Sequence, residues 1–272
     1  MSKQEQPILV LGGTGTVGAR VATQLRASGC AVRVATRSTR PCFDWMRPDS
    51  WASALTDIQT MYVLLPDGTA MPEGFMEHAH RAGVRRVVLH SDRNVDTMNV
   101  TDLQSAERQV RQSSIDWTII RPDWFNQDFE TFFRRPVIEG HLLVPVGSTK
   151  QGFVDADDIA AVAVHTLRRA DHVGETLPLT GPRSLAFVEA LDLITDFTGR
   201  SITFDGTVEG YREALRIDGV PGDAIETRIR NLSAAAAKGD TTPSGVVEAV
   251  LQRPAKDFSA YVHDAAERGV WR

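Results

Sequence analysis

The sequence predicts an α/β protein, with a Rossmann-type doubly wound parallel sheet and a smaller, irregular C-terminal substrate lobe. Two observations carry this prediction. Short apolar runs alternate with helical patterns through the first half, and a glycine-rich turn joins the first apolar run to the first helical pattern. This alternation favours parallel strands that are covered by helices on both faces and connected by right-handed crossovers. The length of 272 residues suits a protein of this class.

The first half of the chain supplies the strands and helices of the expected sheet. Strands are expected where apolar runs are short, and helices where apolar residues recur three or four positions apart. The turn signal Pro66-Asp67-Gly68 closes one of these strands. The expected strands are 8–11, 31–35, 42–45, 61–65, 86–90 and 117–120, and the expected helices are 17–28, 50–55, 74–82 and 102–113.

The second half is less regular and predicts mainly helices. Asp155 and Asp158 precede an apolar segment in the pattern of a capping box, and their charges favour a helix N-terminus. We expect a Rossmann core over residues 1–170, and a C-terminal lobe over 171–272 that also draws on 125–153. The expected helices are 159–167, 187–197, 211–215, 233–238 and 258–268.

Composition and charge argue against several classes of protein. Apolar residues make up 42% of the chain and the net charge is −5, which is typical of a globular protein and not of a nucleic-acid binder. We find no signal peptide and no apolar run long enough to span a membrane. Cys30 and Cys42 form no disulfide framework, and His78 and His80 point in different directions on a helix, so we expect no metal. The expectation is a cytoplasmic monomer or homodimer without nucleic-acid or membrane partners.

The strongest motif is the glycine-rich turn at residues 12–18, which follows a strand and opens a helix. Gly12 permits the tight turn, Gly15 lets the backbone approach a pyrophosphate, and Gly18 lets the helix pack against the strand. The helix amides and dipole attract phosphates. The alternative is a glycine-rich turn without a ligand. The residues predicted to bind the cofactor here are Gly12, Thr14, Gly15, Thr16, Val17 and Gly18.

The end of the second strand favours NADP(H) over NAD(H). An NAD site usually has an acidic residue there for the ribose 2′-hydroxyl. This chain has Arg37, which can form a bidentate pair with a 2′-phosphate, and Ser38 and Arg40 are possible helpers. The alternative is a solvated surface arginine in an arginine-rich chain.

These residues support a resemblance to the NmrA-like atypical short-chain dehydrogenase/reductases over nearly the whole chain. The resemblance implies that Asp44 lies near the adenine, that Leu64, Leu65 and Pro66 line the ribose, and that the chain after Pro122 passes the nicotinamide. Ser91 and Pro122 are therefore included among the cofactor contacts, and Trp124, Phe125, Asn126 and Phe129 are the expected substrate-pocket residues. The markers are the turn at 12–18, Arg37, residues 43–45, 64–66 and 117–122, Phe125, and residues 158–160 and 179–182.

The sequence offers no standard proton donor. Short-chain reductases carry a Tyr-x-x-x-Lys pair in which the tyrosine protonates the substrate. No tyrosine in this chain has lysine four residues on, and the helix where the pair is expected has no tyrosine. Ser91, Asp92 and Asp123 follow strands and are candidate acids, and His90 is a weaker candidate that can point into the core. The alternative is that all four are ordinary polar loop residues or cap a helix, with no catalytic role.

Three functions remain open at this stage. The first is an NADPH-dependent oxidoreductase that transfers hydride to a small aromatic, quinone-like, carbonyl or imine compound, with the aromatic side chains at 124–133 as a flat pocket wall. Those side chains can equally be a packing helix. The second is a non-catalytic NADP(H)-sensing interaction protein, because the Tyr-Lys pair is missing. The third is a redox-neutral enzyme on the same fold, since fold alone does not fix function.

Overall fold

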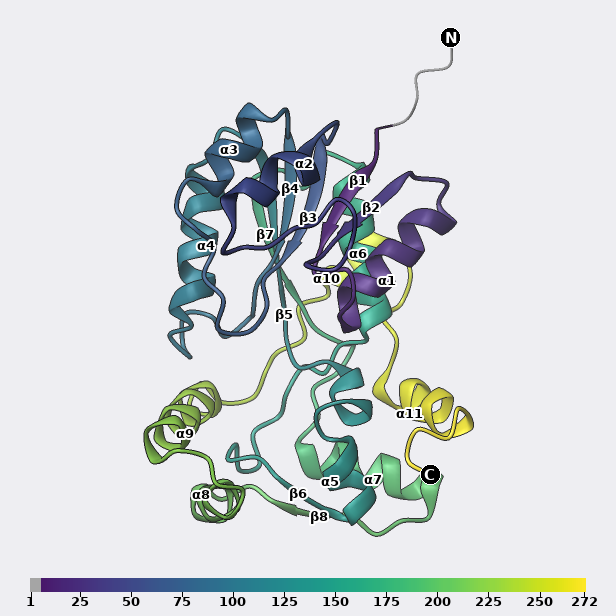
Figure 1. The fold of residues 1–272 in the computed structure, drawn as a ribbon. Helices are drawn as coiled ribbons and strands as arrows, with labels where there is room; N and C mark the ends of the chain where they lie inside the picture. The colour runs from purple at the N-terminus through teal and green to yellow at the C-terminus, as the bar shows by residue number, and fades with distance from the viewer. Residues whose placement is uncertain (1–5) are drawn as a thin grey trace.

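A parallel sheet forms the centre of the protein (Figure 1). The computed structural model describes residues 6–272. The sheet has six strands in the order β2-β1-β3-β4-β5-β7, and every neighbouring pair is parallel. The strands are β1 (Ile8–Leu11), β2 (Val32–Ala35), β3 (Thr60–Leu64), β4 (Arg86–His90), β5 (Asp116–Pro122) and β7 (Glu175–Leu179).

Helices cover both faces of the sheet, because alternate strand residues point to opposite sides. Leu9 and Leu11 belong to one apolar core, which includes α2, α3 and α4, whereas Val10 belongs to the other, which includes α1, α6 and α10. This arrangement confirms the predicted doubly wound fold class. The helices are α1 (Thr16–Ala27), α2 (Trp51–Leu55) after the short 3-10 turn η1 (Pro48–Ser50), α3 (Phe75–Arg81), α4 (Thr101–Gln112), α6 (Ala156–Arg168) and α10 (Val246–Leu251).

The strand order reverses between β1 and β3. The chain runs from β1 outward to β2, and then returns to the other side of β1 to form β3, β4, β5 and β7. At such a switch point the loops diverge beyond the carboxyl ends of the strands and leave a crevice where ligands bind in open α/β sheets. The glycine-rich turn follows β1, so the fold brings it to this crevice.

A second, aromatic-rich lobe lies beyond the carboxyl ends of the strands (Figure 1). β5 leads directly into it, and its two short strands, β6 and β8, form a separate parallel pair. Phe129, Phe153, Phe187 and Phe258 pack together in its core. The elements of the lobe are η2 (Asn126–Glu130), α5 (Arg134–Glu139), β6 (His141–Leu143), α7 (Phe187–Thr198), β8 (Thr203–Asp205), α8 (Val208–Ile217), α9 (Gly222–Ala236) and α11 (Phe258–Glu267).

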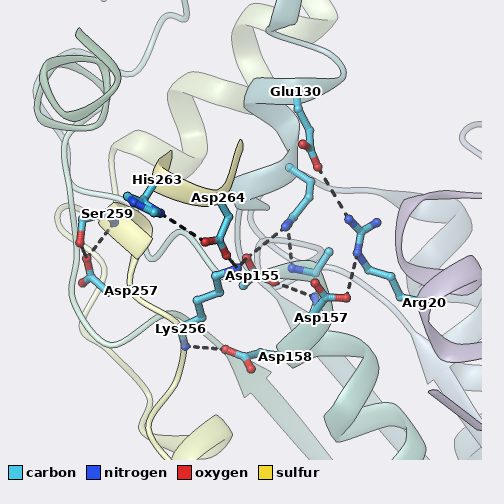
Figure 2. Close-up of polar contacts among 12 residues, drawn as sticks. Arg20, Glu130, Asp155, Asp157, Asp158, Lys256, Asp257, Ser259, His263 and Asp264 are labelled. Carbon is cyan, nitrogen blue, oxygen red and sulfur yellow. Dashed lines mark hydrogen bonds and ion pairs between the residues drawn. The ribbon is translucent and has the colours of Figure 1, made fainter. Parts of the chain in front are cut away.

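A buried polar network around the start of α6 fastens this lobe to the sheet (Figure 2). Asp155 is fully buried, caps α6 by accepting the N–H of Asp157 at 2.9 Å, and accepts a hydrogen bond from Gln127 of η2 at 3.1 Å. The backbone N–H of Lys256 donates to Asp158 at 2.7 Å, and the Lys256 ammonium donates to Asp264 of α11 at 2.7 Å. The expected N-cap is therefore confirmed, although Asp158 binds the C-terminal segment and does not complete a capping box.

Several expected elements differ from the structure. Residues 42–45 are not a strand; Phe43 and Trp45 are buried there, and their rings pack edge-on against each other and Phe75 from a loop. Their alternate apolar positions mimic a strand, but what fixes them is packing against α2 and α3. The helix expected at 233–238 is only the end of α9, which begins at Gly222. Five of the α-helices and strands were not expected: α5, β6, β7, β8 and α10.

The division of the chain remains a proposal. β7 and α10 follow residue 170, yet β7 pairs with β5 and α10 packs on α6. We therefore propose that the Rossmann core of residues 1–170 also recruits these two elements, while the rest of the C-terminal part and residues 125–153 build the lobe.

Within residues 6–272, no helix is both long and apolar enough to cross a bilayer.

Candidate cofactor and reaction site

Packing within the chain explains why two positions of the turn must be glycine. Gly12 has a φ of +79°, and a Cβ there would lie 2.8 Å from the Cβ of Leu64. A Cβ on Gly18 would lie 2.2 Å from the carbonyl oxygen of Gly12. Both positions therefore exclude any larger residue, because β1, β3 and α1 approach one another too closely here.

Gly15 is different, because nothing in the described chain requires glycine there. Its φ is −85°, and a Cβ would meet only the Gly12 oxygen, at the ordinary distance of 3.6 Å. Gly15 and Thr14 are exposed, and in the described part of the chain no side chain caps α1 and no acidic residue lies in its first turn. The first amides of α1 therefore face an open space that suits an anion, and these residues fit a dinucleotide pyrophosphate.

Arg37 lies just past β2, in a loop that hydroxyl groups hold in place. The N–H of Thr36 donates to the Thr39 hydroxyl at 2.8 Å, and the N–H of Ser38 donates to the Thr36 hydroxyl at 3.2 Å. The side chains of Arg37 and Arg40 are exposed, and within residues 6–272 neither forms an ion pair. A guanidinium is thus available at the strand end where the 2′-position of an adenine ribose is expected.

The other predicted nucleotide contacts lie at the same edge of the sheet. The Asp44 carboxylate accepts the N–H of Met46 at 3.0 Å, and its backbone carbonyl accepts the Trp51 indole N–H at 3.0 Å. Leu64 is half-buried against Gly12, Leu65 is buried, and Pro66 is exposed. Leu64 and Pro66 therefore remain accessible at the end of β3, whereas Leu65 supports them from the core.

His90, the last residue of β4, belongs to the core. Its Nδ1 lies 2.7 Å from the Tyr62 hydroxyl, and its ring packs edge-on under Phe125 with the ring centroids 5.9 Å apart. Burial lowers the pKa of His90 to about 4, so the ring is neutral at pH 7. Its role is to support Phe125.

Ser91 is held in a buried ionic network. Its hydroxyl donates to Glu107 at 2.5 Å, while Arg121 donates to both carboxylate oxygens of Glu107, at 2.8 and 2.6 Å. Arg111 pairs with the same carboxylate at 2.8 Å. Burial raises the pKa of Glu107, but the hydrogen bonds from Arg121 and Ser91 outweigh it, so the pKa lies below its usual value. Glu107-x-x-x-Arg111 thus occupies the helix on which a Tyr-x-x-x-Lys pair would be expected, and it remains charged.

Asp123 joins three segments of the chain. One of its oxygens contacts Arg93 at 2.9 Å, the N–H of Gly152 at 3.2 Å and the Thr241 hydroxyl at 3.1 Å. The other oxygen accepts the N–H of Trp124 at 2.9 Å. Because the chain satisfies both oxygens of this buried carboxylate, its arrangement is that of a structural anchor.

Two other carboxylates at this edge keep an oxygen without a partner among residues 6–272. Asp92 follows β4 and accepts the N–H of Asn94 with one oxygen, and Asp128 in η2 accepts the N–H of Phe125 with one oxygen. Burial raises the pKa of Asp92 to about 6 and that of Asp128 to about 7, and the charge of Asp92 adds to the rise at Asp128. The sequence pointed to Asp92 but not to Asp128. The local signal at Asp128 is an acidic residue three positions after Phe125, where it accepts the Phe125 N–H at the start of η2.

The expected pocket residues differ in their accessibility. Trp124 and Phe125 are half-buried, and Phe129 is wholly enclosed in the core of the lobe. Trp124 packs against Phe187, with the ring centroids 5.4 Å apart. Asn126 is fully buried, and neither atom of its side-chain amide has a hydrogen-bond partner in the described chain.

A cavity of about 630 Å³ opens next to this edge, between β7 and the loop after α9. This volume is in the range of small-molecule sites. Arg93, Arg121 and Lys238 contribute to its wall, together with Gln151 and Thr241. The wall is mostly polar, and the aromatic residues expected to form a pocket do not line it.

The fold and the open turn define a dinucleotide-binding protein, and comparisons with known proteins agree. The NAD(P)H-binding family model matches residues 12–170, more than half of the chain. The chain is 34% identical over 217 residues to an uncharacterized oxidoreductase, YesF, of Bacillus subtilis, with 73% of each chain covered. It is 27% identical over 287 residues to an NAD(P)H azoreductase of Xenophilus azovorans, covering 95% of this chain and 98% of that one.

Solved structures share this fold as well. The NADPH complex of the quinone oxidoreductase QOR2 from Escherichia coli matches with a TM-score of 0.80 and 17% identity, over 95% of this chain and 99% of that one. The chain belongs to the NAD(P)H-binding family. The resemblance to NmrA-like atypical short-chain dehydrogenase/reductases is confirmed, and so is the prediction that the chain is an NAD(P)H-dependent oxidoreductase.

Proposed function

We propose that the protein is an NADPH-dependent reductase of small conjugated compounds, such as quinone-like, azo, carbonyl or imine compounds. The observation that carries this proposal is the open space at Gly15 together with the exposed Arg37 after β2, which forms no ion pair within residues 6–272. The names of the relatives, an azoreductase and a quinone oxidoreductase, favour this substrate class. Bound NADPH would supply the hydride. The chain then has to bind the cofactor and the substrate, orient them toward each other and protonate the substrate.

We infer the direction in which the cofactor lies from the topology of the sheet. A dinucleotide with its pyrophosphate on α1 places its two halves on opposite sides of the switch point. Arg37 follows β2, which lies on one side, so the adenosine half belongs there. The nicotinamide half then extends past β3 toward the ends of β4 and β5, where Phe125, Asp92 and Asp128 lie.

The preference for NADPH rests on Arg37. Each hydrogen bond to a charged group contributes about 1.5–3 kcal/mol, which corresponds to about a 10- to 100-fold preference. An exposed guanidinium without an ion-pair partner in residues 6–272 can turn toward a 2′-phosphate without breaking another contact. Asp44 lies seven residues further on, and its carboxylate binds the N–H of Met46.

Asp128 and Asp92 are the proposed proton donors. Asp128 accepts the N–H of Phe125, and the charge of Asp92 acts on Asp128. Each of the two keeps one oxygen that accepts no hydrogen bond within residues 6–272. A general acid acts best when its pKa lies near the working pH, which the raised pKa values of about 7 and about 6 meet. Ser91 and Asp123 are instead positioning residues, since the chain occupies their polar groups.

The proposal is tested by following NADPH oxidation with a quinone, an azo dye, an enone and an imine, and by repeating each assay with NADH. We expect turnover with at least one acceptor and a higher kcat/KM for NADPH. Absence of turnover across the panel, with NADPH bound, would overturn the proposed reaction and leave the family membership intact.

A further inference from the structure

A cluster of metal-binding side chains lies at the opposite edge of the sheet from the glycine turn, where α6 ends and β7 begins. His165 is in the last turn of α6, Asp171 and His172 follow in the connecting loop, and Glu175 is the first residue of β7. One ligand atom each of His165, Asp171 and His172 lies within 4.8 Å of the others. His165 Nε2 is 2.9 Å from an Asp171 oxygen, and the two histidine rings are 5.8 Å apart.

We propose that His165, Asp171 and His172 form a binding site for a divalent transition metal ion, with Zn²⁺ as the representative ion. Zinc binds imidazole nitrogen and carboxylate oxygen at about 2.0–2.2 Å, which puts tetrahedral ligand atoms roughly 3.4 Å apart. The 4.8 Å spread of the three atoms needs only small side-chain rotations to reach this spacing. Two imidazoles favour zinc, nickel or copper over magnesium or calcium, which prefer oxygen ligands.

Glu175 would orient one of these ligands. Its carboxylate lies 2.8 Å from Nδ1 of His172. A carboxylate that accepts the Nδ1 proton fixes the tautomer and leaves Nε2 free as the metal ligand, an arrangement common among metal-bound histidines. Glu175 is therefore a positioning residue.

The backbone around the cluster is already fixed. The Thr118 hydroxyl donates to the carbonyl of His172 at 2.8 Å, and the N–H of Gly174 donates to the carbonyl of Trp117 at 2.7 Å. Both contacts anchor the loop to β5. The side chains of His165 and His172 are 19% and 23% exposed, so they are largely buried yet still reachable from solvent. Little ordering entropy would oppose metal binding.

Charge also favours a divalent cation. The two carboxylates of the cluster, Asp171 and Glu175, together offset a charge of +2. The exposed Arg168 and Arg169 are neighbours in sequence, but within residues 6–272 neither pairs with these carboxylates.

A second cluster on α11 provides a matched control. His263, Asp264 and Glu267 have ligand atoms equally close together. However, the cluster has one histidine, which is 53% exposed, and the Lys256 ammonium already binds Asp264 at 2.7 Å. The Lys256 ammonium therefore already neutralises this carboxylate, which makes it a weaker ligand for a metal than Asp171.

The test is calorimetric titration of Zn²⁺ into the untagged, EDTA-treated full chain. We expect one saturable site, at least a tenfold loss of affinity in His165→Gln and His172→Gln, and no change in His263→Gln. Glu175→Gln should lower the affinity about 10- to 100-fold, as expected for a residue that orients a ligand. Asp171→Asn replaces a half-exposed side chain and should fold even where a histidine variant does not.

The melting temperature measured with and without Zn²⁺ gives an independent readout, because an ion that binds only the folded state stabilises it. Zn²⁺ should raise the melting temperature of the wild type and of His263→Gln, but not that of Asp171→Asn. Equal zinc affinity in the wild type, Asp171→Asn and His172→Gln would overturn the proposal, and so would the absence of a saturable site.

Discussion

Reversing the charge at position 37 should change which cofactor the protein uses. Arg37→Glu removes a guanidinium that is exposed and that forms no ion pair within residues 6–272, so the fold should be unaffected. Loss of a charged hydrogen bond of about 1.5–3 kcal/mol lowers NADPH affinity about 10- to 100-fold. Repulsion between the new carboxylate and the 2′-phosphate adds to this loss. NADH has no such phosphate, so the variant should bind it with an affinity within about threefold of the wild type. That change is smaller than the effect of losing one charged hydrogen bond.

The assay is steady-state kinetics with each cofactor, with KM and kcat/KM measured separately. Arg47→Glu is the control. Arg47 is also exposed and forms no ion pair in the described chain, but it lies just before η1 and not at the end of β2. An unchanged NADPH-to-NADH ratio in Arg37→Glu, or an equal change in Arg47→Glu, would refute the assignment.

Four further variants at this site have expected outcomes. Gly15→Val should leave the melting temperature nearly unchanged but abolish cofactor binding by calorimetry, because the new side chain fills only open space. Gly18→Val should instead lower the melting temperature, because its Cβ would lie 2.2 Å from a carbonyl oxygen. Asp128→Asn should lower kcat and remove a fall in wild-type rate as pH rises through about 7. Asp123→Ala should destabilise the protein by about 1–3 kcal/mol in urea, since it leaves the buried N–H of Gly152 without its hydrogen-bond partner.

Each of these predictions has a contradicting result. Cofactor binding by Gly15→Val with wild-type affinity would show that the turn is not the phosphate site. The same pH profile in Asp128→Asn and wild type would remove Asp128 as the acid, and Asp92→Asn would then be the variant to examine. A loss below about 1 kcal/mol in Asp123→Ala would mean that Asp123 is not the anchor described above.

The raised pKa of Asp128 also has a consequence for stability. Because burial raises the pKa of Asp128 to about 7, the folded state binds this proton more tightly than the unfolded state does. The stability from this group is therefore complete below the ordinary carboxyl pKa and is lost as pH rises toward about 7. Denaturation at pH 5 and pH 8 should show a larger loss of stability in the wild type than in Asp128→Asn.

The sequence was most informative where the structural cause is local. The strands at 8–11 and 86–90 match the structure residue for residue, because buried parallel strands are continuous apolar runs. β7 was missed because it is an edge strand that contains Pro178 and begins with a charged residue. β6 and β8 have only three residues each, too few to show a period.

The candidate site also has a part that could be predicted from the sequence and a part that could not. The glycine turn is a contiguous motif, so its place at the switch point could be predicted. The environments of Glu107 and Asp128 depend on other segments: Arg121 of β5 clamps Glu107, and the lobe buries Asp128. Only the pair of Glu107 with Arg111 has a local spacing; the contacts of Arg121 with Glu107 and the burial of Asp128 arise only when segments distant in sequence meet.

The most direct test of the account is calorimetry of the folded wild-type protein with NADPH and NADH. We predict one site per chain that binds NADPH about 10- to 100-fold more tightly than NADH. Equal affinity for the two nucleotides, or no heat of binding with either, would contradict it.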